Sequence, residues 1–181
     1  MKLAIFSAST RKASINSALV SAIIPRAKEA GFTVTRLDLA DYDMPLYNGD
    51  WHDENGAPDT TKALAKALSG FDAVICISPE YNGSLPPLLK NTVDWMTCLG
   101  DMSAFHNPVW VVGSCTPGPM SGIMVMRQMQ FILTRVGTQV LQFHLGVGNA
   151  GAAFNKDGSL AQKRDQELTA KILGALKTRL G

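Results

Sequence analysis

The segment Lys2–Asn16 reads K-L-A-I-F-S-A-S-T-R-K-A-S-I-N and joins a short apolar run to a polar stretch. The apolar part, Leu3–Phe6, is continuous rather than alternating, which is typical of a strand buried on both faces of a parallel sheet. The ten residues from Ser7 to Asn16 then carry five hydroxyl or amide side chains and one arginine. This junction predicts a buried strand, a polar loop and a helix that begins near Ser14.

The same alternation of strand and helix recurs along the whole chain. Near-continuous apolar strands separated by amphipathic helices predict one α/β domain over residues 1–181. We expect a three-layer sandwich in which five parallel strands, in the order 2-1-3-4-5, have helices on both faces. The expected strands are Lys2–Ser7, Thr33–Leu39, Ala73–Ser78, Val109–Gly113 and Thr138–Leu145, and the expected helices are Ser14–Ala30, Asp59–Leu68, Pro86–Cys98, Met120–Val136 and Leu160–Leu180.

The composition narrows the range of partners. The 181 residues are 46% hydrophobic, and the formal net charge is only +2 with the basic residues dispersed. We therefore expect no nucleic-acid partner and no membrane surface held by charge. No apolar run reaches the roughly 18 residues of a membrane span, and the N-terminus lacks the pattern of a signal peptide.

Cysteine and histidine are sparse and scattered. Cys76, Cys98 and Cys115 are odd in number and show no CxxC spacing, so a disulfide framework or a zinc site is not expected. The three histidines have no paired ligands at metal spacing, and we expect no metal site. Reduced thiols favour the cytoplasm as the compartment.

Three polar loops follow the first, third and fourth expected strands. They are Ser7–Asn16, Pro79–Ser84 and Ser114–Gly122, and the opposite ends of the strands have plainer connections. In an open parallel sheet, ligands bind beyond the carboxyl ends of the strands where the strand order reverses. With the order 2-1-3-4-5, the three loops converge on that place.

The first loop has the donors of a phosphate site. A helix that begins near Ser14 offers free N–H groups and a partial positive charge, and Arg11 adds a fixed charge. Ser9, Thr10 and Asn16 supply further hydrogen-bond donors around a dianionic phosphate. The alternative is that Ser14 only caps the helix and Arg11 is a solvated surface residue.

Two of these loops also resemble a known family. S-A-S-T-R-K-A-S-I-N, Ser7–Asn16, resembles the G-S-x-R-x-x-S-x-N phosphate loop of the NADPH-dependent FMN reductase family, which includes quinone- and chromate-reducing members. Pro79–Trp95 reads P-E-Y-N-G-S-L-P-P-L-L-K-N-T-V-D-W and resembles the P-E-Y-N-x-S-x-P-x-x-L-K-N-x-x-D-W of that family. The intermediate M-P-L-Y-N of Met44–Asn48 agrees as well.

The resemblance implies a flavodoxin-like fold, bound FMN, NADPH or NADH as hydride donor, and a homodimer or homotetramer. It places the FMN phosphate on the first loop, the flavin ring along the second loop and its pyrimidine end on the third. The residues so implied are Ser9, Arg11, Ser14, Ile15 and Asn16, then Pro79, Glu80, Tyr81, Asn82, Gly83 and Ser84, then Ser114, Thr116 and Gly118.

The function that follows is electron transfer from a reduced nicotinamide through the flavin to a small-molecule acceptor by a ping-pong mechanism. The acceptor could be a quinone, free flavin, an azo dye or a metal oxyanion, and no side-chain acid or base is required. The alternatives are a flavodoxin-like electron carrier and a non-enzymatic regulatory domain. A carrier usually has an acidic docking face, and a sequence pI of about 8.5 argues against one.

Several residues keep two interpretations. Tyr81 could border the ring or pack against a neighbouring subunit. Glu80 could help organise the loop by accepting backbone N–H bonds, or it could meet a partner chain. Trp95 is expected in the core or an interface, and Cys115 is expected to be a buried, unreactive thiol. The long connection Asp41–Pro58 has no clear period and is either a lid or a subunit contact.

One motif is rejected. Gly146–Gly151 spells G-x-G-x-x-G after a strand, as in dinucleotide-binding folds. That site requires a helix opening directly at the glycines and a further parallel strand beyond it. Residues 152–158 read as a loop, and only one helix remains after them.

Overall fold

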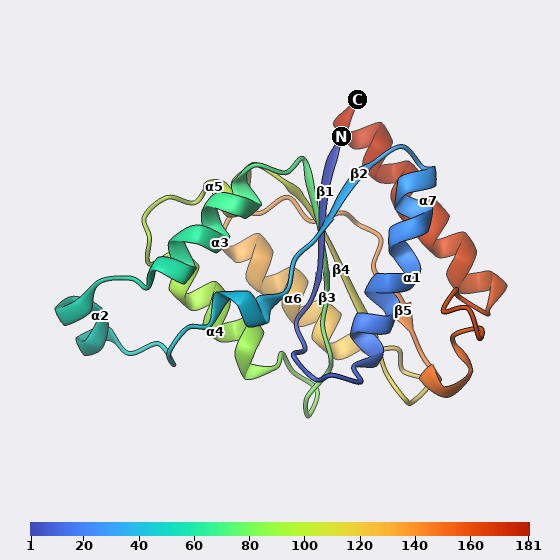
Figure 1. Cartoon of the computed structure of the whole chain (residues 1–181), viewed down its shortest axis with the longest axis horizontal. Helices are drawn as coiled ribbons and strands as arrows, with labels where there is room; N and C mark the ends of the chain where they lie inside the picture. Colours follow the sequence, from blue (N-terminus) through green and yellow to red (C-terminus); the bar gives the residue numbers. More distant parts are fainter.

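A computed structural model describes residues 1–181 and shows a five-stranded parallel sheet with the order β2-β1-β3-β4-β5. The predicted α/β architecture and strand order are therefore confirmed. Figure 1 shows the sheet between two layers of helices, with the amino ends of the strands at the top and the carboxyl ends below. The strands are β1 (Lys2–Ser7), β2 (Thr33–Arg36), β3 (Ala73–Ile77), β4 (Val109–Cys115) and β5 (Leu145–Val147).

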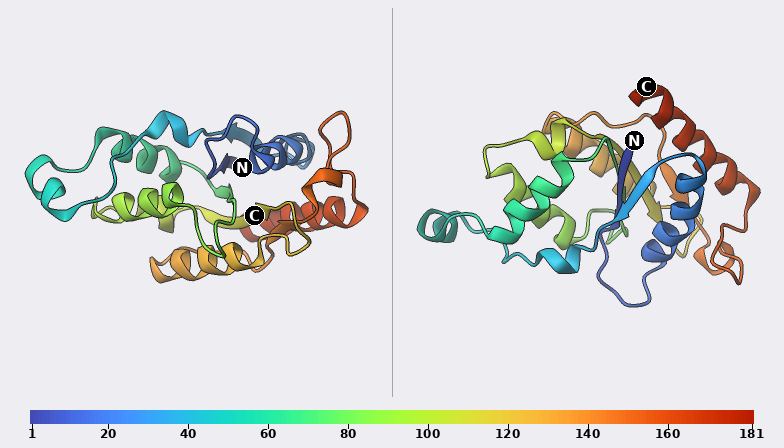
Figure 2. Two further views of the ribbon diagram at one scale, coloured as in Figure 1. Left: turned by 90° about the horizontal axis from the view of Figure 1, so that it is seen from below. Right: turned by 45° about the horizontal axis from the view of Figure 1, so that its top comes forward.

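The helices divide between the two faces of the sheet, as the views in Figures 1 and 2 show. Helices α1 and α7 cover one face, and α3, α4 and α6 cover the other. The helical elements are α1 (Ile15–Glu29), η1 (Leu39–Tyr42), α2 (Gly49–Asn55), α3 (Asp59–Ser69), α4 (Pro87–Thr97), α5 (Ser103–His106), α6 (Ile123–Arg135), η2 (Ala150–Ala152) and α7 (Lys163–Leu180).

The continuous apolar strands are explained by burial on both faces. Leu3 and Ile5 of β1 pack with α1 and α7, whereas Ala4 and Phe6 pack with the helices on the opposite face. Successive side chains of a strand point to opposite faces, so a strand covered on both sides needs apolar residues at every position. Every residue of β3 and β4 is buried.

The prediction for the fifth strand was wrong in position. Residues 138–141 make an isolated bridge to the start of β4, through Val140 and Trp110, but the regular strand begins only at Leu145. The chain has no strand pairing between these two points. The apolar residues of 138–145 therefore belong to two separate short pairings with β4. In the sequence these two segments resemble one continuous strand.

Most other element ends moved by a few residues for local reasons. Strand β2 ends at Arg36, short of the predicted Leu39, because the Asp38 carboxylate accepts the N–H of Ala40 and starts the 3-10 turn η1. Helix α6 starts at Ile123, not Met120, because Ser121 and Gly122 have φ of 56° and 70° in the left-handed region. Helix α7 starts at Lys163, three residues after Leu160, which pairs with Phe154 in an isolated bridge.

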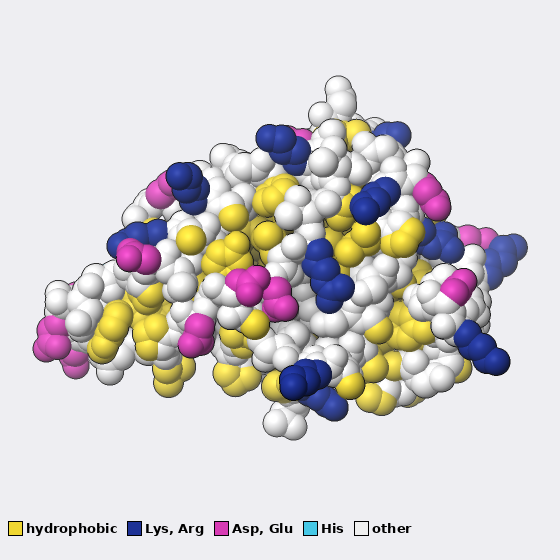
Figure 3. Space-filling view, in the orientation of Figure 1, with side chains coloured by type: hydrophobic (Ala, Val, Ile, Leu, Met, Phe, Trp, Pro, Cys, Tyr) yellow, Lys and Arg dark blue, Asp and Glu magenta, His cyan; other side chains and the backbone are white.

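The connection Asp41–Pro58, which shows no clear period in the sequence, contains helix α2. The Asn48 side chain caps this helix by accepting the N–H of Trp51 at 3.1 Å, and Gly56 ends it with φ of 75°. None of its residues is buried, so it has no apolar period to detect. Figure 1 shows α2 projecting from the body of the molecule, and Figure 3 shows acidic side chains gathered at that end.

The rejection of the glycine-rich motif is confirmed. After β5 the chain forms only the short 3-10 turn η2 and then a loop, and no further strand follows.

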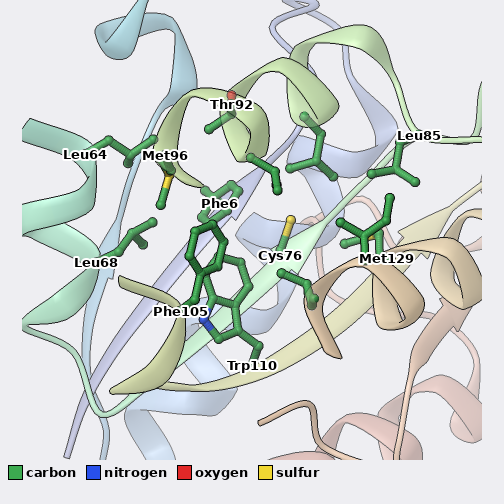
Figure 4. Close-up of a pocket in the computed structure, with 14 residues that line it drawn as sticks. Phe6, Leu64, Leu68, Cys76, Leu85, Thr92, Met96, Phe105, Trp110 and Met129 are labelled. Atoms are coloured by element: carbon green, nitrogen blue, oxygen red, sulfur yellow. The ribbon is translucent and has the colours of Figure 1, made fainter. Parts of the chain in front are cut away.

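The core layer under α3, α4 and α6 contains a small apolar void (Figure 4). Its volume is about 20 Å³, room for one water molecule, and Phe6, Cys76 and Trp110 are among its lining residues. It is a packing feature and is too small for a cofactor. None of the helices combines the length and the apolar character needed to cross a bilayer.

We predict that His144 makes the stability of the fold depend on pH. Its ring is half-buried, its Nε2 has no hydrogen bond, and burial lowers its pKa below the usual value. In the unfolded protein the imidazole titrates at about pH 6.5, so it binds a proton more readily there than in the folded protein. The contribution to stability is therefore complete above that pH and is lost as the pH falls from there through the lower pKa of the folded state.

Urea unfolding at pH 7.5, 6.5 and 5.5 tests this. The free energy of unfolding of the wild type should fall over this range more steeply than that of His144→Gln. The exposed, non-titrating Gln142 provides the control, because Gln142→Asn should keep the wild-type slope. Equal slopes in wild type and His144→Gln would show that the ring is not the cause.

Candidate functional site

The loops after β1, β3 and β4 lie side by side at the carboxyl edge of the sheet, at the bottom of Figure 1. Backbone hydrogen bonds continue the sheet into the loops. The N–H of Ala8 donates to the carbonyl of Ile77 at 2.8 Å, and the N–H of Ser78 donates to that of Gly113 at 2.9 Å. The parallel register therefore brings the three predicted loops together.

The first loop ends in the N-terminus of α1. The Ser14 hydroxyl caps the helix by accepting the N–H of Ser17 at 3.2 Å, and the Ser14 N–H donates to the carbonyl of Arg11. The first turn of α1 has no acidic residue, so its partial positive charge is not neutralised. The Arg11 side chain is exposed and has no acidic partner, which leaves its guanidinium free for an anion.

Asn16 has a different geometry from the rest of the first loop. Its side chain is 2% exposed, donates to the carbonyl of Cys115 at 3.1 Å and accepts the N–H of Cys115 at 2.8 Å. Both ends of the amide are thus engaged by the end of β4. Ile15 beside it is partly buried and packs against the apolar core under α1.

The second loop is a tight turn. The backbones of Tyr81 and Ser84 exchange two hydrogen bonds of 3.0 Å, and Asn82 and Gly83 between them have φ of 53° and 77°. Positive φ at both central residues is the geometry of a type I′ turn, which Asn-Gly favours. Pro79 is buried at the base of the loop, whereas Tyr81 is 46% exposed at its tip.

Helix α6 fixes the second loop in place. The Glu80 carboxylate accepts the N–H groups of Met124 and Val125 at 3.1 and 3.0 Å. This confirms that Glu80 accepts backbone N–H bonds, although the donors belong to the first turn of α6 and not to its own loop. A carboxylate at a helix N-terminus is favoured by the free N–H groups and the helix dipole.

Gln128 of α6 also holds the second loop, a role that the sequence analysis did not identify. Its Oε1 accepts the Ser84 hydroxyl at 2.7 Å, and its Nε2 donates to the carbonyl of Gly83 at 3.1 Å. A glutamine inside a helix gives no signal by its type or spacing. Only the packing of α6 beside the second loop shows its contact.

The third loop packs against the segment after β5. The N–H of Asn149 donates to the carbonyl of Gly118, and the N–H of Ala150 donates to that of Thr116, both at 3.1 Å. The Thr116 hydroxyl also donates to the Gly118 carbonyl. Ser114 lies beneath the loop, fully buried, and its hydroxyl has no hydrogen-bond partner.

Cys115 is not a reactive thiol. Burial raises its pKa to about 12, and the nearby Asp165 carboxylate acts in the same direction. A thiol with so high a pKa remains protonated at neutral pH and is a poor nucleophile. The expectation of a buried, unreactive cysteine is confirmed.

Trp95 is a core residue at the base of the projecting α2 segment. It is fully buried, and its indole N–H donates to the carbonyl of Pro45 at 2.7 Å. Tyr47 and Trp51 contact its ring edge to face, with centroids 4.9 and 5.6 Å away. The aromatic residues of 41–58 therefore attach the segment to α4, which begins directly after the second loop.

The chain matches the family model described as NADPH-dependent FMN reductase over residues 1–152. It is 33% identical over 133 residues to the quinone reductase of Escherichia coli K12, covering 74% of this chain and 69% of that relative. It is 32% identical to the NADPH:quinone oxidoreductase of Arabidopsis thaliana, covering 98% of this chain and 90% of that relative.

A solved structure agrees with these matches. FerB, a flavoenzyme NAD(P)H:(acceptor) oxidoreductase from Paracoccus denitrificans, superposes with a TM-score of 0.81 at 25% identity, covering 97% of this chain and 94% of that one. The family match over residues 1–152 includes all three loops, and the superposition spans nearly the whole chain. On this evidence the chain belongs to the NADPH-dependent FMN reductase family.

Proposed function

We propose that this protein is an FMN-dependent NAD(P)H oxidoreductase that reduces quinone-like small molecules. One observation carries the proposal: an unpaired arginine and a helix N-terminus with no acidic residue in its first turn lie beside an exposed, rigid turn at the carboxyl edge of the sheet. Such an edge suits a ligand with a phosphate at one end and a flat ring at the other. The quinone reductases among its relatives support the choice of acceptor.

The first loop fits the phosphate of FMN. Ser9, Arg11 and Ser14 would hold it through hydroxyls, one guanidinium and the N–H groups at the start of α1. Asn16 and Ile15 would act on the loop itself, since Asn16 fixes its position against β4 and Ile15 anchors it in the core.

The second and third loops fit the ring. Gly83 at the turn has no side chain, so the backbone of Asn82, Gly83 and Ser84 can lie close to a ring edge. Glu80 and Gln128 hold that backbone. Pro79 is buried at the base of the loop, and the exposed Tyr81 would border the ring. Ser114, Thr116 and Gly118 would lie along the other edge. Bound FMN supplies the hydride and electron chemistry.

Donor and acceptor would use the same open face above the second loop, because this chain offers one rigid turn beside one phosphate site. Binding in turn at one face predicts ping-pong kinetics. The acceptor class is open to quinones, free flavin, azo dyes and metal oxyanions, all of which need only an accessible face. Three free cysteines, two of them buried, suit a reducing compartment such as the cytoplasm.

We expect the purified protein to be yellow and to bleach when NADH or NADPH is added without oxygen. Addition of benzoquinone should then restore the colour in one turnover, and steady consumption of the nucleotide should need no partner protein. Stopped-flow absorbance in the flavin bands measures both steps. A protein that bleaches but is not reoxidised by any small acceptor would favour an electron carrier. A protein that holds no flavin after soaking in FMN would exclude both the oxidoreductase and the electron carrier.

Arg11→Ala should weaken FMN binding by about 1.5–3 kcal/mol, the loss of one charge-assisted hydrogen bond. Folding should change little, because the side chain is exposed and makes no contact that supports the core. Fluorescence titration of the apoprotein with FMN measures the change. Lys28→Ala, which removes the same charge at the far end of α1, is the control. If Arg11→Ala bound FMN with wild-type affinity, Arg11 would not contact the phosphate.

We also propose a homodimer or homotetramer. Helix α6 exposes Phe131 at 72% and carries Arg127 and Arg135 with no acidic residue. Residues 37–59, in contrast, hold seven acidic residues and no lysine or arginine, and they expose Leu46 at 81%. Two patches with exposed apolar residues and opposite charge on one chain can pair between copies.

Phe131→Glu should therefore shift the protein toward the monomer in sedimentation velocity at micromolar concentration. The exposed Thr178→Glu on α7 is the matched control and should sediment like the wild type. A wild-type protein that sediments as a monomer at all concentrations would contradict the proposal.

A further inference from the structure

A polar hollow of about 480 Å³ lies between the third loop, the segment after β5 and the start of α7. The last two of these segments are at the lower right of Figure 1. Three segments line it. Ser121 comes from the third loop, Asn149 from the segment after β5, and Gln162, Arg164 and Asp165 from the start of α7. None of the residues proposed to hold FMN lines this hollow.

Asp165 is the unusual residue in the hollow. It is only 3% exposed, yet its carboxylate accepts no hydrogen bond from the chain, and its Oδ1 is buried without a partner. The closest cation is the exposed guanidinium of Arg164, with Nη1 at 3.6 Å from Oδ1. Burial raises the pKa of Asp165, and the Arg164 charge only partly opposes this. A buried carboxylate without a hydrogen bond costs stability, so a ligand that donates a hydrogen bond to it offsets that cost when it binds.

The rest of the hollow offers mainly donors. Gln162 makes no side-chain cap for α7, so the N–H groups of Lys163 and Arg164 in the first turn have no acceptor in the chain. The Arg164 guanidinium is exposed, and the side-chain amide of Asn149 makes no hydrogen bond to the chain. These groups favour an anion at the mouth of the hollow.

One class of ligand can pair with both the carboxylate and the hydrogen-bond donors of the hollow. A simple anion would be repelled by Asp165, and a divalent cation would find only one carboxylate. A ribose donates from its vicinal hydroxyls to a carboxylate, as acidic residues bind nucleotide ribose in other folds. A phosphate attached to that ribose can reach the N–H groups of α7 and Arg164.

We propose that this hollow binds the adenosine ribose and its phosphate from the reduced nicotinamide dinucleotide, with Asp165 accepting hydrogen bonds from the ribose hydroxyls. The inference rests on the proposed function for the identity of the dinucleotide. Its position supports it, because the hollow and the proposed ring site share the third loop as a common wall. Asn149 at the hollow donates its backbone N–H to Gly118, which borders the ring site.

Calorimetric titration of the FMN-loaded protein with ADP-ribose tests the proposal. This probe contains the adenosine half of the dinucleotide and lacks the nicotinamide, so it binds without reducing the flavin. ADP-ribose should bind the wild type, and Asp165→Asn should bind it about tenfold more weakly because a charge-assisted hydrogen bond becomes a neutral one. The free energy of unfolding of unliganded Asp165→Asn should not fall, since a buried charge that accepts no hydrogen bond from the chain is removed.

Glu167→Gln is the matched control. It removes the same charge from the same helix, at an exposed position outside the hollow, and should keep the wild-type affinity. Failure of ADP-ribose to bind a protein that carries FMN and bleaches with NADH or NADPH would overturn this inference and leave the proposed function standing. Equal affinity of wild type and Asp165→Asn would also overturn it. A protein that takes up no FMN would instead defeat the proposed function.

Discussion

The site depends on the side chain of Asn16, which joins two loops far apart in sequence. Its amide both donates to and accepts from the backbone of Cys115, at 3.1 and 2.8 Å, in the interior where water cannot compete. The start of α1 is thereby fixed against the end of β4. The proposed phosphate donors and the third loop keep one spacing because of this pair of bonds.

The second loop obtains its rigidity from another part of the chain. Glu80 and Gln128 attach it to α6, and the Asn82-Gly83 turn needs no further support because its backbone angles suit these two residues. A ring held along such a turn meets backbone groups that do not have to move. This preorganisation is what a protein contributes when a cofactor carries the reaction.

The two faces of the third loop have different chemistry. Its backbone at Thr116 and Gly118 is held by the segment after β5, and toward α7 the loop borders a hollow in which a buried carboxylate lies among donors. Asp165 costs the empty protein stability where a neutral residue would not. The presence of such a residue beside a proposed cofactor site is the pattern expected when stability is exchanged for binding.

The sequence by itself determined the sheet, its strand order, the positions of the three loops and the cap at Ser14. These follow from local causes: apolar runs, helix starts and turn residues lie next to each other in the chain. It misplaced β5 and missed α2, because neither has a period of its own. Only the tertiary structure decided that Asn16 binds Cys115, that Glu80 and Gln128 hold the second loop, and that Asp165 stands bare. Those contacts join residues more than 40 positions apart or record a missing partner, and no local pattern encodes either.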